Sequence, residues 1–136
     1  MIKERTKFPL ILKISYLNDY RDRLFWKKIE GLVSAISINA VPWSMVYGDK
    51  KSPFEKYGYG PGAVSGKTAQ THTWALHKYL TEITKIPVIL PSISETDDLI
   101  EAFNKRKAPA VSMCALLLQN SSEAMAIIER CLKKII

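Results

Sequence analysis

Four short apolar runs, each followed by a segment with helical spacing, limit what this chain can fold into more than any other feature. The runs span 8–14, 33–39, 86–90 and 109–117 and are rich in residues that favour strands. Short continuous apolar runs are typical of strands buried on both faces of a parallel sheet. Because strands that alternate with helices pair in parallel through right-handed crossovers, the sequence predicts an α/β fold.

The segments between these runs have the apolar spacing of amphipathic helices. We expect one helix over 19–30, with Asn18 as its N-cap, and another over 66–84, with Ser65 as its N-cap. The buried side of the second helix is predicted to hold Ala69, Thr73, Leu76, Leu80 and Ile83.

Two further helices are expected after the third and fourth runs. Ser94 and Asp97 match a capping box, and the helix dipole favours the charges of Asp97 and Asp98 at a helix start. The C-terminal helix should begin at Ser121 or Ser122. Its buried stripe is predicted to be Met125, Ile128, Leu132 and Ile135.

A glycine-rich connection over 40–64 interrupts the alternation, and a structureless loop of that length is usually functional. It continues into the stretch 58–70, GYGPGAVSGKTAQ, where amide groups at a glycine-lined helix start can bind an anion such as phosphate. The spacing fits neither a P-loop, because Pro61 stands where the first glycine is needed, nor the dinucleotide fingerprint. A ligand-binding loop and a plain surface loop before a capped helix both remain open.

Composition narrows the function classes. At 136 residues the chain has the size of one domain, and its net charge of +7 comes from basic residues scattered along the sequence. No basic stripe is interleaved with aromatic residues, which argues against nucleic acid as a partner and is compatible with anionic ligands. The N-terminus has no apolar signal region and no apolar run approaches a membrane span, so we expect a cytoplasmic protein without a membrane partner.

Common catalytic and metal motifs are missing from the sequence. His72 and His77 lie five residues apart, about 140° around a helix, so they cannot share a metal ion and are expected at the surface. Cys114 and Cys131 lack zinc or redox spacing, and we expect both to be buried free thiols in a reducing compartment. No GxSxG elbow marks a serine nucleophile. The residues assign neither a metal site nor a catalytic group.

Two polar residues at strand ends point to a ligand site. Lys13 interrupts the first apolar run, and a lysine in a buried strand is costly unless it pairs with a negative group or lies at the carboxyl end of the strand. Asn39 ends the second run and offers an amide donor and acceptor. Because parallel α/β folds carry their sites at the carboxyl ends of strands, we expect Lys13, Asn39 and the loop over 58–66 on one rim. A lysine that extends into solvent is the alternative for Lys13.

The ordered set LILKIS, ISINAV, GAVSGKTA, IPVILPSISETDDLIEAF and APAVSMCALL resembles a known family. It is similar to the C-terminal half of the dihydroorotate dehydrogenase family, which includes the pyrimidine-reducing domain of dihydropyrimidine dehydrogenase. The resemblance implies that residues 1–136 are one partial domain carrying strands five to eight of an FMN-binding (β/α)8 barrel. It implies an oxidoreductase that passes a hydride between FMN and a dihydropyrimidine or dihydroorotate.

The resemblance also assigns roles to single residues. Lys13 matches a lysine that touches the flavin ring, where its charge stabilises the reduced form. Asn39 matches an asparagine that hydrogen-bonds the pyrimidine. The remaining matches to FMN-contacting positions are Ser65, Gly66, Pro91, Ser92, Cys114 and Ala115.

The chain departs from the family pattern in three places. Pro91 and Ser92 replace a glycine pair that binds the FMN phosphate through backbone amides, and proline has no amide hydrogen. Ala40 replaces a threonine or serine. The family's first half, which carries the catalytic base, has no counterpart here, and no residue of this chain replaces that base by spacing. A non-catalytic half-barrel that binds a partner chain or a phosphate ligand is therefore the alternative.

Half a barrel leaves two strand edges unpaired, and open edges pair with other chains. The sequence therefore predicts that the chain is no stable monomer. Either a homo-oligomer or a missing N-terminal half would close the sheet.

Overall fold

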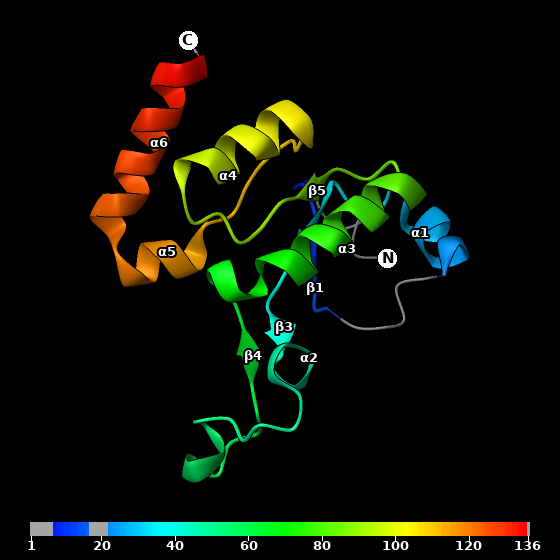
Figure 1. Ribbon diagram of the computed structural model, residues 1–136. Coiled ribbons are helices and arrows are strands. Elements are labelled where there is room, and N and C mark those ends of the chain that lie inside the picture. The colour runs from blue at the N-terminus through cyan, green and yellow to red at the C-terminus, as the bar shows by residue number, and fades with distance from the viewer. Residues whose placement is uncertain (1–6, 17–21, 136) are drawn as a thin grey trace.

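The computed structural model describes residues 7–16 and 22–135 of the chain. Its centre is a parallel sheet in the order β1 (Ile11–Ile14), β2 (Ala35–Ile38) and β5 (Val88–Ile89), drawn in Figure 1. Successive strands are neighbours and the connections between them carry helices, as expected for right-handed β–α units. The predicted α/β fold with a parallel sheet is confirmed.

The fourth strand, which was predicted to lie within 109–117, is reduced to one residue pair. A single parallel bridge joins Leu90 to Val111, and the chain then turns into α5 (Cys114–Gln119). The segment CALLLQ is rich in alanine and leucine, which are strong helix formers, and a short apolar run does not distinguish strand from buried helix. The sheet therefore continues to a fourth position through one residue pair.

Burial of the strands is one-sided, which corrects the expectation of strands buried on both faces. The side chains that alternate toward the helices form a core with Trp26 of α1 (Arg23–Ile29) and Leu80 of α3 (Gln70–Ile83). The strand residues packed in that core are Leu12, Ile14, Ile36, Ile38 and Val88. On the other face Lys13 is exposed and Ile11 keeps 58% of its surface accessible.

The first helix is capped by Asp22, whose carboxylate accepts a hydrogen bond from the Leu24 amide. The expected cap, Asn18, and the expected first turn over 19–21 lie outside the described residues. A single 3₁₀ turn, η3 (Gly66–Ala69), precedes α3, and Ser65 makes no side-chain cap bond there, so the predicted Ser65 cap is wrong. The predicted buried side of α3 is correct at Ala69, Thr73, Leu76 and Leu80, whereas Ile83 is half-buried.

The third helical unit consists of α4 (Thr96–Ile100) and a π-helical turn, η4 (Glu101–Lys105). Its capping box joins Glu95 to Asp98, one residue later than the predicted pair of Ser94 and Asp97. Asp98 has its carboxylate buried against the backbone amides of Ser94 and Glu95. This box fixes the loop between β5 and α4.

The C-terminal helix, α6 (Ser121–Ile135), is capped by the Asn120 side chain, which accepts from the Glu123 amide, rather than by Ser121 or Ser122. Its buried face is Ala124, Ile127 and Cys131, which pack on α4 and η4. The predicted stripe is therefore wrong in part, because Met125 and Leu132 are more than half exposed, Ile128 is half-buried and the side chain of Ile135 is not described. None of the helices in the described residues combines the length and apolarity needed to cross a bilayer.

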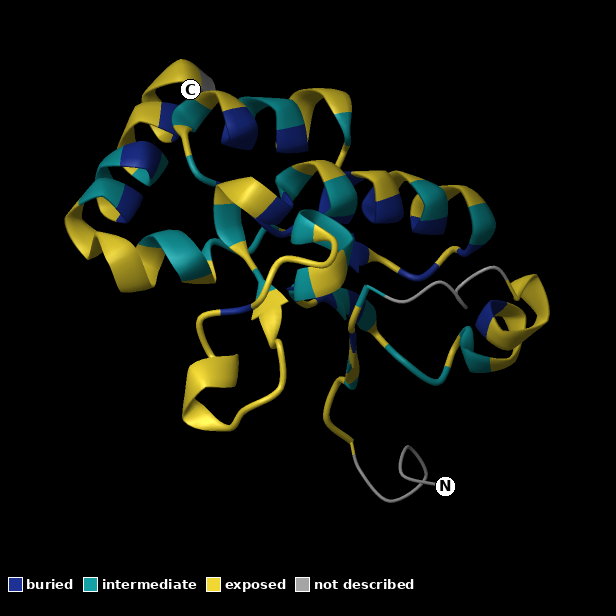
Figure 2. Ribbon diagram, turned by 60° about the horizontal axis from the view of Figure 1, so that its bottom comes forward, coloured by how far each residue is buried: buried dark blue, intermediate teal, exposed yellow. Residues whose placement is uncertain are grey.

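The composition of the connection over 40–64 had suggested a loop without structure, but the connection contains short helices and strands. It contains β3 (Val41–Pro42), α2 (Trp43–Tyr47), η2 (Glu55–Tyr57) and β4 (Ala63–Val64), and β3 pairs antiparallel with β4. Figure 2 shows the outer part of this arm projecting from the body with exposed residues along most of its length. Pairing of the two short strands brings the chain back to the sheet just before Ser65.

The burial of Cys114 and of His77 differs from the prediction. Cys131 is a buried free thiol as predicted, but Cys114 is exposed. His77, expected at the surface, is 1% exposed and its Nε2 has no hydrogen-bond partner among the described residues. Burial lowers the pKa of His77 below its ordinary value, and the charge of Arg106 lowers it further, while a hydrogen bond with the Val88 backbone opposes the shift. The folded chain therefore favours the neutral imidazole.

Stability should fall in mild acid because of His77. Below about pH 6.5 the unfolded chain binds a proton that the folded chain resists, so the free energy of unfolding decreases by at most about 1.4 kcal/mol per pH unit. We compare the wild type with His77→Asn, which keeps a donor for the Val88 backbone. Urea titrations at several pH values between 7.5 and 5.5 should show that the free energy of unfolding falls more steeply with decreasing pH in the wild type. Parallel curves for the two proteins over that range would contradict this origin of the pH dependence.

Candidate functional site

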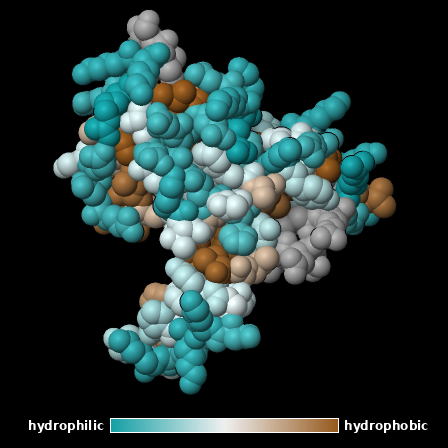
Figure 3. All heavy atoms as spheres, viewed as in Figure 1, coloured by the Kyte–Doolittle hydropathy of each residue, from teal (hydrophilic) through white to brown (hydrophobic). Residues whose placement is uncertain are grey.

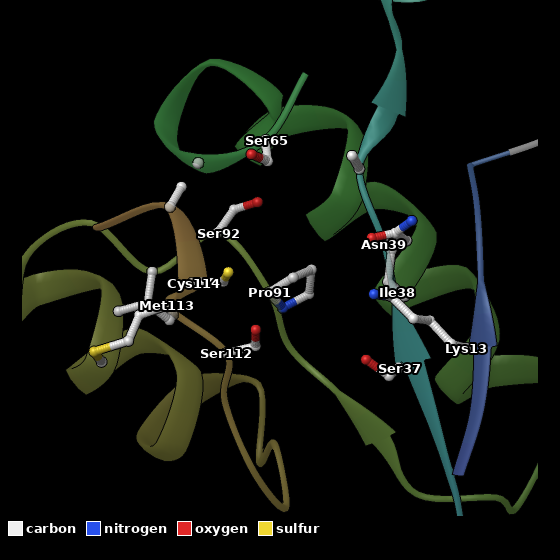
Figure 4. A pocket seen from close by; sticks show the side chains of 14 residues that line it. Lys13, Ser37, Ile38, Asn39, Ser65, Pro91, Ser92, Ser112, Met113 and Cys114 are labelled. Atoms are coloured by element: carbon white, nitrogen blue, oxygen red, sulfur yellow. The ribbon is translucent and has the colours of Figure 1, made fainter. Parts of the chain in front are cut away.

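A cavity of about 200 Å³ opens at the carboxyl ends of the parallel strands. All eight residues that the sequence and the family resemblance pointed to line it, from five separate segments of the chain, and Figure 4 labels six of them. They are Lys13, Asn39, Ser65, Gly66, Pro91, Ser92, Cys114 and Ala115. The expectation that Lys13, Asn39 and the glycine loop share one rim is therefore met in the structure.

Lys13 and Asn39 are brought together by strand pairing. The Asn39 amide donates to the Ile14 carbonyl at 2.7 Å, which aligns the end of β2 with the end of β1. Lys13 is paired in register with Ser37, so its side chain emerges on the same face as the Ser37 hydroxyl. Figure 4 shows the Lys13 side chain directed into the cavity beside Asn39. Lys13 is nevertheless exposed, because it lies on the face of the sheet opposite the core that α1 and α3 cover.

Gly66 lets the loop approach α5 closely. Its φ of +73° lies in the left-handed region that glycine tolerates best, and a Cβ placed there would come within 3.0 Å of the Ala115 Cβ. The segment Ser65–Gly66 follows β4 directly and forms one wall of the cavity. A glycine at this position is therefore required by both conformation and space.

Lys67 anchors this loop from the side away from the cavity. Its Nζ donates to the Glu95 carboxylate and lies 3.5 Å from Asp98 Oδ1. Glu95, as hydrogen-bond acceptor, raises the pKa of Lys67 above its ordinary value, and the Asp98 charge adds to the effect. The lysine of the GKT sequence therefore ties η3 to the start of α4, a positioning role that the sequence analysis missed.

Pro91 and Ser92 line the cavity, and Figure 4 shows Pro91 between Lys13 and Cys114. Ser92 has a φ of 64°, a backbone conformation in which glycine is usual. The α3 side holds it there, because Thr73 Oγ1 lies 3.1 Å from the buried Ser92 hydroxyl and Gln70 Nε2 donates to the Ser92 carbonyl at 3.0 Å. Ser92 therefore keeps a glycine-like backbone in a position where the family resemblance expects a glycine.

Other polar groups that line the cavity were not foreseen. The hydroxyl-bearing Ser37 could have been found from strand alternation, since it lies two residues before Asn39 on the same face. Ser112 has no such signal, because it follows a single bridge residue rather than a regular strand. Figure 4 shows both below Pro91, with Ser112 on the side of Cys114 and Ser37 on the side of Lys13.

The charge of the cavity is positive. Lys13 contributes an ammonium group, and the described lining residues include several hydroxyls and the Asn39 amide but no carboxylate. Donors without a competing negative charge favour an anionic or strongly polar ligand. The cavity volume of about 200 Å³ is below the range of about 300–1,000 Å³ that is usual for pockets that hold drug-sized molecules and cofactors.

Replacing Gly66 with alanine should distort this wall. We expect Gly66→Ala to lower the free energy of unfolding by about 1–3 kcal/mol, because a left-handed alanine is strained and its methyl meets Ala115. Urea denaturation measures the loss, and Gly60→Ala, where a Cβ meets nothing within 4 Å, should stay within about 0.5 kcal/mol of the wild type. Adding Ala115→Gly to Gly66→Ala should restore part of the loss, and a pair of alanine variants with equal stability would refute the close-approach argument.

Comparisons with known proteins found no relative of this chain. No family model matches the chain, and neither a curated protein nor a solved structure matches it. The function is therefore argued from the residues that line the cavity and from the motifs that they belong to.

Proposed function

We propose that this chain is the C-terminal half of a (β/α)8 flavin oxidoreductase of the dihydroorotate and dihydropyrimidine dehydrogenase type. It would bind FMN and act on a dihydropyrimidine or dihydroorotate in the cytoplasm, where free thiols such as Cys131 stay reduced. One observation carries the proposal: the eight residues matched to that family converge on one cavity at the carboxyl ends of parallel strands. Independent surface motifs would have no reason to meet there.

The cavity residues fit the ring portion of such a cofactor. The Lys13 ammonium can stabilise negative charge on a flat ring system, and the Asn39 amide can both donate to and accept from a pyrimidine edge. Gly66 allows close approach on the loop side. When bound, FMN supplies the hydride-transfer chemistry, and this chain supplies binding and orientation.

The fit to the phosphate is poorer. Pro91 has no amide hydrogen to donate, and the hydroxyl of Ser92 is already in contact with Thr73. Cys114 and Ala115, the other positions matched to the phosphate, also line the cavity, and Figure 4 shows Cys114 across from Lys13. Grip on a phosphate is therefore expected to be weaker than in a site with two glycine amides.

A second candidate function follows from what the cavity lacks. Among the described residues that line it there is no carboxylate or imidazole to remove a substrate proton. This lack favours a non-catalytic half-barrel that binds a partner chain or a phosphate ligand. The two candidates differ in whether the flavin ring itself is recognised.

Flavin titration separates the two candidates. We expect the purified chain to retain FMN with a perturbed visible absorption band, and Lys13→Ala to weaken the affinity about tenfold or more through loss of a charged contact. Lys105→Ala, which removes an exposed lysine remote from the cavity lining, is the matched control. Riboflavin should bind as well, since the ring provides most contacts. Colourless protein that binds inorganic phosphate instead would reject the flavin proposal in favour of the non-catalytic one.

A further inference from the structure

The backbone at residues 91–93, directly after β5, offers little to a phosphate group. Proteins usually hold phosphate oxygens with backbone amides and with cationic side chains. Pro91 has no amide hydrogen, and the Ile93 amide donates to the Ser112 carbonyl at 3.4 Å. Of these three residues, Ser92 alone keeps an amide without a partner among the described residues.

Asp98 takes the next two amides and acts as an internal anion. Its Oδ2 accepts hydrogen bonds from the Ser94 amide at 2.8 Å and from the Glu95 amide at 3.2 Å. The Asp98 side chain is buried, and a carboxylate at a helix start is stabilised by the helix dipole. The chain therefore places its own negative charge on amides that a ligand would need.

The cations that reach the start of α4 are also paired within the chain. Lys67 donates to Glu95 and lies 3.5 Å from Asp98. Lys134 lies 3.7 Å from Asp97. Figure 3 shows mostly hydrophilic residues on the flank that α4 and α6 form. A phosphate beside this loop would meet three carboxylates whose cationic partners are already engaged.

The other positions matched to the phosphate, Cys114 and Ala115, begin α5. Amides in the first turn of a helix have no partner within the helix, so they remain as donors. Among the described residues that line the cavity, however, the one cation is Lys13, and Figure 4 shows it across the cavity from Cys114. A phosphate bound at α5 would therefore lack the charged partner that makes such contacts strong.

The rest of the lining suits a neutral, hydroxylated ligand. Ser37, Ser65 and Ser112 line the cavity, and their hydroxyls make no hydrogen bond with another described residue. Each hydroxyl can donate and accept, as can the Asn39 amide. The chain of hydroxyl groups that joins a flavin ring to its phosphate matches this surface better than the phosphate does.

We infer that the cavity recognises the ring and the hydroxylated chain of a flavin but not its terminal phosphate. Riboflavin, which ends in a hydroxyl group, is then as good a ligand as FMN. The inference rests on the proposed function, since it takes binding of the flavin ring from there. It adds the class of cofactor, a flavin without a phosphate requirement, and assigns the cause to the loop after β5.

Fluorescence titrations of the full chain with riboflavin and with FMN, both at an ionic strength of about 0.15 M, test the inference. We expect the two dissociation constants to agree within about twofold. A phosphate held by charge-assisted hydrogen bonds would instead make FMN the tighter ligand by about tenfold or more. The comparison uses the wild-type chain, so it does not depend on the folding of a variant.

Pro91→Gly tests the cause. Glycine supplies the amide hydrogen that proline lacks, so FMN should bind about tenfold more tightly, whereas the affinity for riboflavin should change by less than about twofold. Pro53→Gly is the matched control, because this exposed proline of the projecting arm lies outside the cavity lining, and it should change neither constant. Circular dichroism checks the fold of both variants.

The outcomes distinguish a failure of this inference from a failure of the proposed function. FMN that binds the wild type about tenfold more tightly than riboflavin would overturn the inference and leave the flavin proposal standing. A chain that binds neither flavin would overturn both. If Pro91→Gly leaves the affinity for FMN unchanged, the missing proline amide is not the cause, and the assignment to this loop is wrong.

Discussion

Parallel hydrogen bonding between β1, β2 and β5 is the constraint on which the rest of the structure depends. It aligns the carboxyl ends of strands that lie far apart in the sequence, so that Lys13 of β1, Asn39 after β2 and Pro91 after β5 line one cavity. The core of Trp26, Ile36 and Leu80 holds the helices on one face and keeps the strand ends in place. Without this register Lys13 and Asn39 would not share a cavity.

The same pairing leaves the structure one-sided. Among the described residues, helices bury one face of the sheet, and the cavity has Lys13 on one side and Cys114 on the other. Lys13 is exposed in this cavity, so water competes with any ligand for its ammonium group.

Local geometry at the rim depends on contacts that cross the fold. Ser92 holds a left-handed backbone because α3 supplies Thr73 and Gln70 to its polar atoms. Lys67 fixes the glycine loop through the acidic start of α4. No local sequence motif predicts either set of contacts, since the partners are 19–31 residues apart.

The sequence alone determined the alternation of strands and helices, the parallel sheet and the shared rim of Lys13, Asn39 and the glycine loop, because periodicity and strand ends are local properties of the chain. The tertiary structure decided which apolar run becomes a helix, as at α5, and which side of α6 is buried. It also decided that His77 is buried and Cys114 exposed. These outcomes depend on which surfaces meet in space, which no local pattern of the sequence specifies.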